Sequence, residues 1–332
     1  MQLQRRSAPG YIQAHRDGRR VRDRLHSGQV NARYNSAGAY FARRFGCKTY
    51  KIALDGGMTC PNRDGALGTG GCKFCAGGSG DFAEPYDGDV EGMITRAIAR
   101  VRHKGAEKYI AYFQSYTNTY APPEKLEALF VPAASDERIA ALSVGTRPDC
   151  LPPEAVELLA RVDRIKPVFV ELGLQTSNDR TAAAFGRGYK TEVYDRAVGA
   201  LARAGLEVVT HVILGLPGES AEDMIATVRH AADCGTAGIK LQLLHILRGT
   251  EYADMYERGL IPAMSLGEYI DVLCECVRAL PPRVVVHRLT GDAPKRLLVA
   301  PLWSADKKRV INAIAAAFEA RGVIQGEKCT EK

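Results

Sequence analysis

Short runs of apolar, β-branched residues alternate along most of the chain with longer amphipathic segments. The short runs predict strands, and the amphipathic segments, several of which end at a glycine, predict helices. Strands are expected at residues 49–55, 108–114, 139–146, 167–175, 206–215 and 238–247, and helices at 88–105, 152–162, 191–205 and 220–235. Helical connections between successive strands are typical of a parallel α/β sheet.

Six consecutive units of this kind favour a partial barrel over a flat doubly wound sheet, although the pattern alone fits both. The expected fold class is therefore α/β, a partial (β/α)6 barrel similar to a TIM barrel. In either architecture ligands bind at the C-terminal ends of the strands. That rim is where functional residues are expected.

The rhythm of the pattern changes after Gly259. A helix at 266–279, a strand at 283–291 and a final helix at 304–321 are expected to form a small C-terminal α/β extension. The predicted organisation is a basic leader at 1–33, a partial barrel at 34–262 and the extension at 263–326, packed on the barrel.

The composition is that of a soluble globular protein, with 46% apolar and 25% charged residues. No apolar run has the length of a membrane span, and the N-terminal segment has no signal-peptide hydrophobic region. The cytoplasm is therefore the expected location, with no membrane partner. Nine cysteines without a secretion signal indicate reduced thiols, some of them metal-binding, rather than a disulfide framework.

The net charge of +7 is concentrated at the N-terminus. Residues 1–33 carry eight arginines and two aspartates, a balance of +6, so the remaining residues sum to only +1. The global charge therefore does not predict that the folded body binds nucleic acid. The leader is expected to be disordered; an RNA-contacting arm and a start codon placed too far upstream are the alternatives.

Three cysteines lie in the loop "CPNRDGALGTGGCKFC", Cys60 to Cys75, directly after the first predicted strand. A structural zinc site needs a fourth ligand, but the next cysteine, Cys150, lies far along the chain and no nearby histidine has ligand spacing. Three thiolates suit a four-iron cluster better, because they leave one iron open for a substrate or cofactor. Zinc in a redox or structural role and free core thiols are the alternatives.

This loop resembles the cluster loop of radical S-adenosylmethionine (SAM) enzymes, whose usual spacing is CxxxCxφC with φ aromatic. The longer first gap is similar to that of the branch that includes the catalytic subunit of elongator. The stretches "YFQSYTNTYAP", "GTRPDCLP", "VELGLQT", "GLPGES", "LLHILRGT" and "VVHRLTGD" resemble the bacterial YhcC/YtqA group within that branch. The resemblance extends over residues 34–326, nearly the whole chain outside the leader.

The resemblance implies that Cys60, Cys72 and Cys75 bind a [4Fe–4S] cluster whose open iron coordinates SAM. One-electron reduction of the cluster then cleaves SAM to a 5′-deoxyadenosyl radical, which abstracts hydrogen from a substrate. The backbone of Phe74 is expected to face the adenine. A reductase, or a flavodoxin or ferredoxin, is implied as the electron donor.

The resemblance also assigns cofactor contacts to the strand ends. Gln114 and Ser115 stand where relatives carry a glycine-rich SAM-binding turn, here "QSYTN". Gly145 replaces a glutamate of elongator-like enzymes in the stretch "GTRPD". On the fourth strand, Glu171 and Gln175 share a parity that predicts a position facing the barrel lumen. The resemblance places Gln175 near SAM.

Arg187 is implied to approach the SAM carboxylate, with an ordinary salt bridge as the alternative. Gly215 in "GLPGES" is implied to lie close to the adenine or ribose, unless it serves only an ordinary turn. His211 is in phase with Gly215 and is either a proton donor in the lumen or a buried structural histidine. The catalytic residues stay open, with Glu171, His211 and Cys150 as the candidates, of which Cys150 could contact the substrate.

The resemblance implies a tRNA substrate and a reaction on an existing wobble-uridine side chain, for example remodelling of 5-carboxymethylaminomethyl-uridine. Residues 283–310 carry seven Lys and Arg against two Asp, with Trp303 beside them. That pattern fits an RNA contact or, alternatively, a solvated helix face with a core tryptophan. The competing functions are a radical SAM enzyme acting on a small metabolite or tetrapyrrole, and a non-catalytic iron–sulfur or zinc module.

Overall fold

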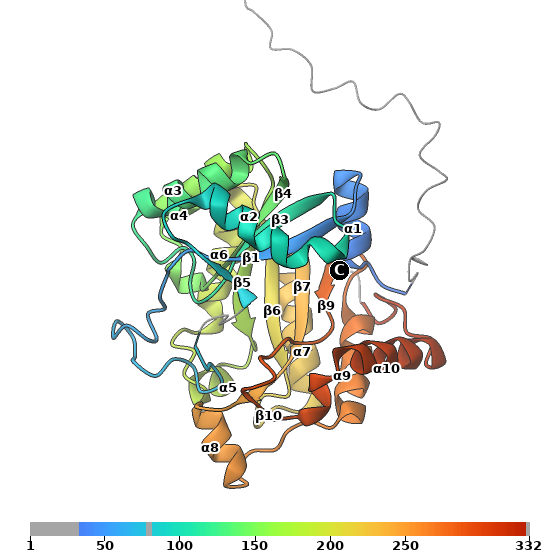
Figure 1. Cartoon of the computed structure of the whole chain (residues 1–332). Helices are drawn as coiled ribbons and strands as arrows, with labels where there is room; N and C mark the ends of the chain where they lie inside the picture. The colour runs from blue at the N-terminus through green and yellow to red at the C-terminus, as the bar shows by residue number, and fades with distance from the viewer. Residues whose placement is uncertain (1–32, 78–81, 330–332) are drawn as a thin grey trace, which may run out of the picture. The chain divides into compact units, whose positions relative to one another are not determined.

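A parallel sheet forms the centre of the computed structural model, which describes residues 33–77 and 82–329 (Figure 1). Its eight strands lie in the order β2-β1-β3-β4-β5-β6-β7-β9, and every neighbouring pair is parallel. The strands are β1 (Thr49–Asp55), β2 (Glu84–Pro85), β3 (Lys108–Phe113), β4 (Ile139–Thr146), β5 (Val168–Gln175), β6 (Glu207–Leu214), β7 (Gly238–Leu243) and β9 (Val285–Arg288). A separate antiparallel pair joins β8 (Ile246–Leu247) to β10 (Leu298–Ala300).

Ten α-helices accompany the strands in the described part of the chain. They are α1 (Ala37–Phe45), α2 (Val90–Val101), α3 (Pro123–Ser135), α4 (Pro153–Asp163), α5 (Asp179–Ala184), α6 (Thr191–Arg203), α7 (Ala221–Asp233), α8 (Glu251–Glu257), α9 (Leu266–Ala279) and α10 (Lys307–Ala320). Their local sequences explain their limits. For example, Ser220 and Asp223 form a capping box at the start of α7, and Gly46 ends α1 in a left-handed conformation.

The expected partial barrel and its six main strands are confirmed. Four helices, α1, α3, α5 and α8, were not predicted. Among them α3 contains Pro132, which argues against a helix on sequence grounds. The extension at 263–326 does more than pack beside the barrel, because β9 joins the sheet next to β7. The described residues, 33–77 and 82–329, belong to one compact unit. Of the predicted leader at 1–33, only Arg33 lies within the described residues.

The two faces of the sheet have different environments. On β1, Ile52 and Leu54 are buried in the main core against the helices, whereas Lys51 and Ala53 point to the other face and are partly exposed. In a flat sheet β1 and β5 would lie about 14 Å apart, at about 4.8 Å per strand. Lys51 nevertheless contacts Glu171 of β5 at 2.5 Å. The sheet is therefore curled, and this second face is the lumen.

Apolar residues fill the N-terminal end of the lumen. Phe41 of α1 packs against the rings of Phe169 and His287, with centroids 5.4 and 5.5 Å away. Buried residues of three more strands complete this floor: Ile110, Ala141 and Val209. The lumen is therefore closed at one end by α1, and ligands must enter from the rim at the C-terminal ends of the strands. No helix among the described residues is long and apolar enough to cross a bilayer.

Candidate active site

The cysteine loop follows β1 and is fixed by hydrogen bonds to two other segments of the rim. The backbone N–H of Lys73 donates to the carbonyl of Phe185, and the Lys73 carbonyl accepts from Tyr252 in α8, both at 3.0 Å. The side-chain amide of Asn62 donates to the carbonyl of Gly186 at 2.8 Å. Phe74 packs its ring on Phe185 at 5.2 Å. The loop is thereby held at the open end of the lumen, where α5 and α8 also lie (Figure 1).

Cys60, Cys72 and Cys75 are partly exposed thiols and form no disulfide. Burial raises the pKa of Cys72 to about 11, against the lowering effect of the Asn62 amide, which donates to its sulfur at 3.5 Å. Both other thiols lie close enough to raise the Cys72 pKa further. An incoming metal would favour the thiolates directly, since thiol ligands bind deprotonated.

The number of thiols in the loop favours a cluster over a single zinc ion. Tetrahedral zinc with Zn–S bonds of about 2.3 Å holds its sulfurs about 3.8 Å apart. Within the described residues, one other group alone brings three potential ligand atoms within 4.8 Å of one another. The loop itself offers three thiols, one ligand fewer than a structural zinc site needs, and three thiolates leave one iron of a four-iron cluster open.

Backbone strain concentrates at the predicted SAM positions. In the described part of the chain, the non-glycine residues with positive φ are Ser115 (80°), Tyr116 (60°) and Gln175 (61°). All three follow or end strands at the rim. Asn118 holds the first turn by donating its side-chain amide to the carbonyls of Ser115 and Gly145. Strained residues of this kind persist where the surroundings impose them and are frequent at ligand sites.

A network of charged side chains occupies the middle of the lumen. Glu171 of β5 is fully buried and accepts hydrogen bonds at both carboxylate oxygens. Lys51 and Ser143 donate to Oε1; Lys240 and the Nε2 of His211 contact Oε2, the latter at 2.6 Å. The predicted lumen positions of Glu171 and His211 are therefore confirmed by contact.

Burial and mutual contact set the charges of this network. Although burial opposes it, the two lysines hold the pKa of Glu171 well below its usual range, so the carboxylate is ionised. Burial and Lys240 lower the pKa of His211 to about 4, so this imidazole is neutral and donates Nε2–H to Glu171. Burial also lowers the pKa of Lys240 to about 7.

Comparison with known proteins decides the family. Residues 65–231 match the Radical SAM superfamily, and residues 236–320 match the Radical_SAM C-terminal domain. The chain belongs to the radical SAM superfamily. The YtqA protein of Bacillus subtilis is 41% identical over 297 residues, covering 89% of this chain and 92% of YtqA, and the YhcC protein of Escherichia coli is 38% identical over 281 residues, covering 84% and 90%.

More distant similarities lead to elongator-like proteins. The tRNA uridine(34) acetyltransferase of Methanocaldococcus jannaschii is 26% identical over 176 residues, which cover 52% of this chain and 32% of that protein. The structure of Methanocaldococcus infernus Elp3 superimposes with a TM-score of 0.65 at 19% identity, covering 83% of this chain and 64% of that one. The radical SAM fold of the chain is thereby confirmed. The chain is accordingly an enzyme whose cofactors are a [4Fe–4S] cluster and SAM.

Arg187 of this radical SAM enzyme is buried and bonded within the chain. Its guanidinium donates to the carbonyls of Leu174, Thr176 and Tyr189 and to the carboxylate of Asp179. The side chain therefore braces the end of β5, as the salt-bridge alternative required. Contact between Arg187 and the SAM carboxylate stays a prediction.

Two glycines at the rim have steric reasons to be glycine. Gly215 has a φ of +88°, and a Cβ there would lie 2.7 Å from the sulfur of Met264. A Cβ at Gly145 would lie 3.4 Å from the Phe113 carbonyl and 3.6 Å from the Tyr112 hydroxyl. The first observation supports the ordinary-turn alternative. The second shows why a larger residue at Gly145 would crowd the lumen.

Cys150 lines a hollow of about 670 Å³ between the segments that follow β3 and β4. Its thiol is buried, and burial together with Asp149 raises its pKa to about 12. A neutral thiol at this place is a poor nucleophile. Its proposed role in contacting substrate stays a prediction, as do the SAM contacts of Phe74 and Gln114.

Several site residues were missed at the sequence level. Lys51, Tyr112 and Ser143 lie in the lumen in phase with their strands, so the parity argument applied to Glu171 could have found them. Arg63 donates to the carbonyl of Cys75 and lies over the ring of Tyr116 at 5.8 Å. No periodic signal marks such a contact within a loop.

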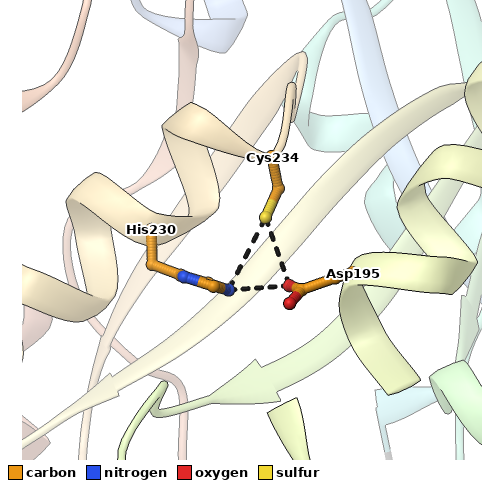
Figure 2. Close-up of side chains that lie close together, drawn as sticks. All are labelled: Asp195, His230 and Cys234. Atoms are coloured by element: carbon orange, nitrogen blue, oxygen red, sulfur yellow. Dashed lines mark hydrogen bonds and ion pairs between the residues drawn. The ribbon is translucent and has the colours of Figure 1, made fainter. Parts of the chain in front are cut away.

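A second group of potential metal ligands lies away from the rim. Figure 2 shows His230 and Cys234 at one end of α7 pointing toward Asp195 of α6. Asp195 Oδ1 lies 2.7 Å from His230 Nε2 and 3.2 Å from the Cys234 sulfur. These hydrogen bonds satisfy the three groups, and burial and Asp195 raise the pKa of Cys234 to about 12. Cys234 therefore lies beside two further potential metal ligands, but its thiol remains protonated at neutral pH.

Proposed function

We propose that this radical SAM enzyme modifies tRNA at the side chain of the wobble uridine. The single observation that carries the proposal is the sequence similarity to tRNA uridine(34) acetyltransferase, which covers 52% of this chain. The match covers only 32% of that protein, so its acetyl transfer is not carried over. The reaction proposed here acts on an existing side chain, with remodelling of 5-carboxymethylaminomethyl-uridine as the concrete form.

When bound, the cluster and SAM supply a 5′-deoxyadenosyl radical that removes hydrogen from a substrate carbon. The contribution of the chain is to hold Cys60, Cys72 and Cys75 at the rim and to close the lumen below it. The apolar floor around Phe41 keeps bulk water out of the N-terminal end. A reductase, or a flavodoxin or ferredoxin, is proposed as the electron donor.

A basic hollow on the C-terminal extension supports RNA binding. It has a volume of about 610 Å³ and is lined by Lys295, Leu302, Trp303, Ala305, Asp306, Lys307, Lys308 and Arg309. Leu302 is 70% exposed, and basic groups beside an apolar surface suit a phosphate backbone with an unstacked base. The Trp303 indole donates to the Met264 carbonyl at 2.9 Å and packs on Tyr269, so its inner edge belongs to the core.

Nucleoside mass spectrometry of bulk tRNA tests the proposal. A strain lacking the gene is expected to accumulate one uridine derivative and lose another. Wild-type enzyme and Cys234→Ala are expected to restore the profile, whereas Cys72→Ala is not. An unchanged profile in the deletion strain would contradict the tRNA assignment and favour a small-metabolite substrate.

The basic hollow has a separate test. Lys308→Met and Arg309→Met are expected to weaken tRNA binding and to lower the slope of log Kd against log salt by about 1 for each phosphate contact removed. Lys104→Met, at an exposed lysine beyond α2, is the matched control. Equal slopes for all three variants would remove the hollow from the RNA-binding surface.

A further inference from the structure

Two lysines in the lumen share one carboxylate. Lys51 Nζ lies 2.5 Å from Glu171 Oε1, and Lys240 contacts Oε2. The next cation, Arg288, pairs with Asp292 at 3.2 Å, a carboxylate that it shares with Lys307. Within the described residues, the network therefore carries one positive charge more than its acids balance when both lysines are protonated.

An excess charge in this place is costly unless a ligand neutralises it. The Lys240 side chain is only 5% exposed, and a buried charge needs a partner of opposite sign. The ring of Tyr112 offers partial compensation, since Lys51 and Lys240 lie 5.0 and 4.4 Å from its centroid. Every acceptor position of Glu171 is already used.

Small residues lie on the rim side of the charges. The residues in phase with the network, one step closer to the rim, are small on three strands: Ala53, Gly145 and Gly173. All three are partly exposed. Below the network lies the apolar floor of α1. An anion can therefore reach the lysines only along the path that leads from the cysteine loop.

We propose that Lys51 and Lys240 form a carboxylate-binding site that receives the acidic end of the substrate's side chain. The inference rests on the proposed function, because the 5-carboxymethylaminomethyl group ends in a carboxylate. SAM carries a carboxylate too, but Tyr112 and Glu171 lie two and four residues before Gln114 and Gln175 on their strands. At about 3.3 Å per residue, the charges are at least about 7 Å deeper than the rim where SAM is expected.

Proton uptake is coupled to such binding. The pKa of Lys240, about 7, rises when an anion binds, so affinity is highest below pH 7 and falls as pH increases through that value. The neighbouring charged and titratable groups are Lys51, Tyr112, Glu171, His211, His287, Arg288 and Asp292. Among them His211 and His287 are already neutral at pH 7, because burial lowers both pKa values. Lys240→Met is expected to abolish the pH dependence.

A charge series tests the site on the reconstituted holoenzyme. The observable is the ratio of affinities for two anticodon stem–loop RNAs, one with 5-carboxymethylaminomethyl-uridine and one with 5-methylaminomethyl-uridine, so phosphate contacts cancel. Lys240→Met removes the excess charge and is expected to lower the ratio about 10- to 100-fold, the range of hydrogen bonds to charged groups. Glu171→Gln removes the opposing acid; at least one uncompensated lysine charge remains even where Lys240 loses its proton, so the ratio is expected to be kept or raised. The double variant Lys240→Met/Glu171→Gln restores one excess charge and is expected to recover much of the loss.

The outcomes separate the possible failures. A ratio near one for wild type, or a ratio that follows none of the charge changes, overturns the site. If the ratio falls equally in Glu171→Gln and in the double variant, the network has only a structural role, and the proposed site is also overturned. If Lys240→Met lowers the affinity for SAM but leaves the ratio unchanged, the lysines bind the carboxylate of SAM and not that of the substrate. The same ratio measured with free nucleosides does not require RNA binding, so it tests the lumen even where the tRNA assignment fails.

Discussion

Replacing Gly71 by alanine tests how the cysteine loop keeps its shape. Gly71 has a φ of +77°, and a Cβ there would lie 2.9 Å from three atoms of the Arg63 guanidinium group. Because these atoms end a flexible side chain, Arg63 can move aside. In doing so it loses its hydrogen bond to the Cys75 carbonyl and its place over Tyr116. The part of the loop around Cys75 then loses its link to the part around Cys60.

Two other glycines of the same loop separate the contributions. Gly70 has no neighbour within 4 Å and no positive φ, so Gly70→Ala is expected to be nearly neutral. Gly65 also has open space but a φ of +95°, so Gly65→Ala costs about 1–2 kcal/mol for the left-handed conformation. Gly71→Ala adds the lost hydrogen bond to a charged donor, about 1.5–3 kcal/mol more. Any entropic gain from alanine applies to all three.

The assay is anaerobic iron release from the reconstituted enzyme to a chelator, followed by visible absorbance. The expected order of release is wild type and Gly70→Ala slowest, Gly65→Ala intermediate and Gly71→Ala fastest. In an Arg63→Met background, Gly71→Ala should add no more than Gly65→Ala does, because the two sites then no longer interact. If Gly71→Ala released iron no faster than Gly65→Ala in the wild-type background, Arg63 would not hold the loop.

Three further outcomes follow from the structure. Cys72→Ala is expected to abolish the iron content, the brown colour and SAM cleavage, whereas Cys234→Ala leaves all three unchanged. Equal iron loss in both variants would indicate that the group of Asp195, His230 and Cys234 also binds iron. Phe41→Ala is expected to lower the free energy of unfolding by about 3–5 kcal/mol in urea titrations, as large-to-small changes in a packed core do, and a loss below about 1 kcal/mol would show that α1 does not seal the lumen. His211 is expected to keep constant NMR shifts from pH 5 to 8, since its pKa lies near 4; a midpoint near 6.5 would contradict its burial near the Lys240 charge.

Local periodicity was sufficient to predict the strands and one side of the lumen. β1 and β5 begin and end within a residue of their predicted limits. The parity of Glu171 along β5 placed it in the lumen, and the alternation is broken only at Gln175, where a bulge shifts the register. The position of the cysteine loop at the rim followed from the chain order alone.

Long-range pairing could not be predicted from the same signals. Lys240 and His245 have opposite parity on the strand predicted at 238–247, so only one of them can face the lumen, and the contact of Lys240 with Glu171 shows that it is Lys240. The addition of β9 to the sheet depends on its pairing with β7, for which a short apolar run gives no partner. The contact of Arg63 with Cys75 could not be predicted for the same reason, because it lies within a loop that has no repeating geometry.

The depth of the lumen gives the charged network and the strained rim different tasks. Ser115 and Gln175 adopt left-handed conformations at the level of the cysteine loop, where the reactive part of SAM is expected. Lys51 and Lys240 lie below them, and the floor around Phe41 blocks any deeper binding. A substrate arm whose acid end is bound by the lysines has no freedom to slide further down, so the carbons between its acid end and its base must lie near the rim. The position of each carbon along the lumen, rather than a catalytic acid or base, would then select the carbon that loses hydrogen. This agrees with a network in which all acceptor positions of Glu171 are occupied by hydrogen bonds and His211 is neutral.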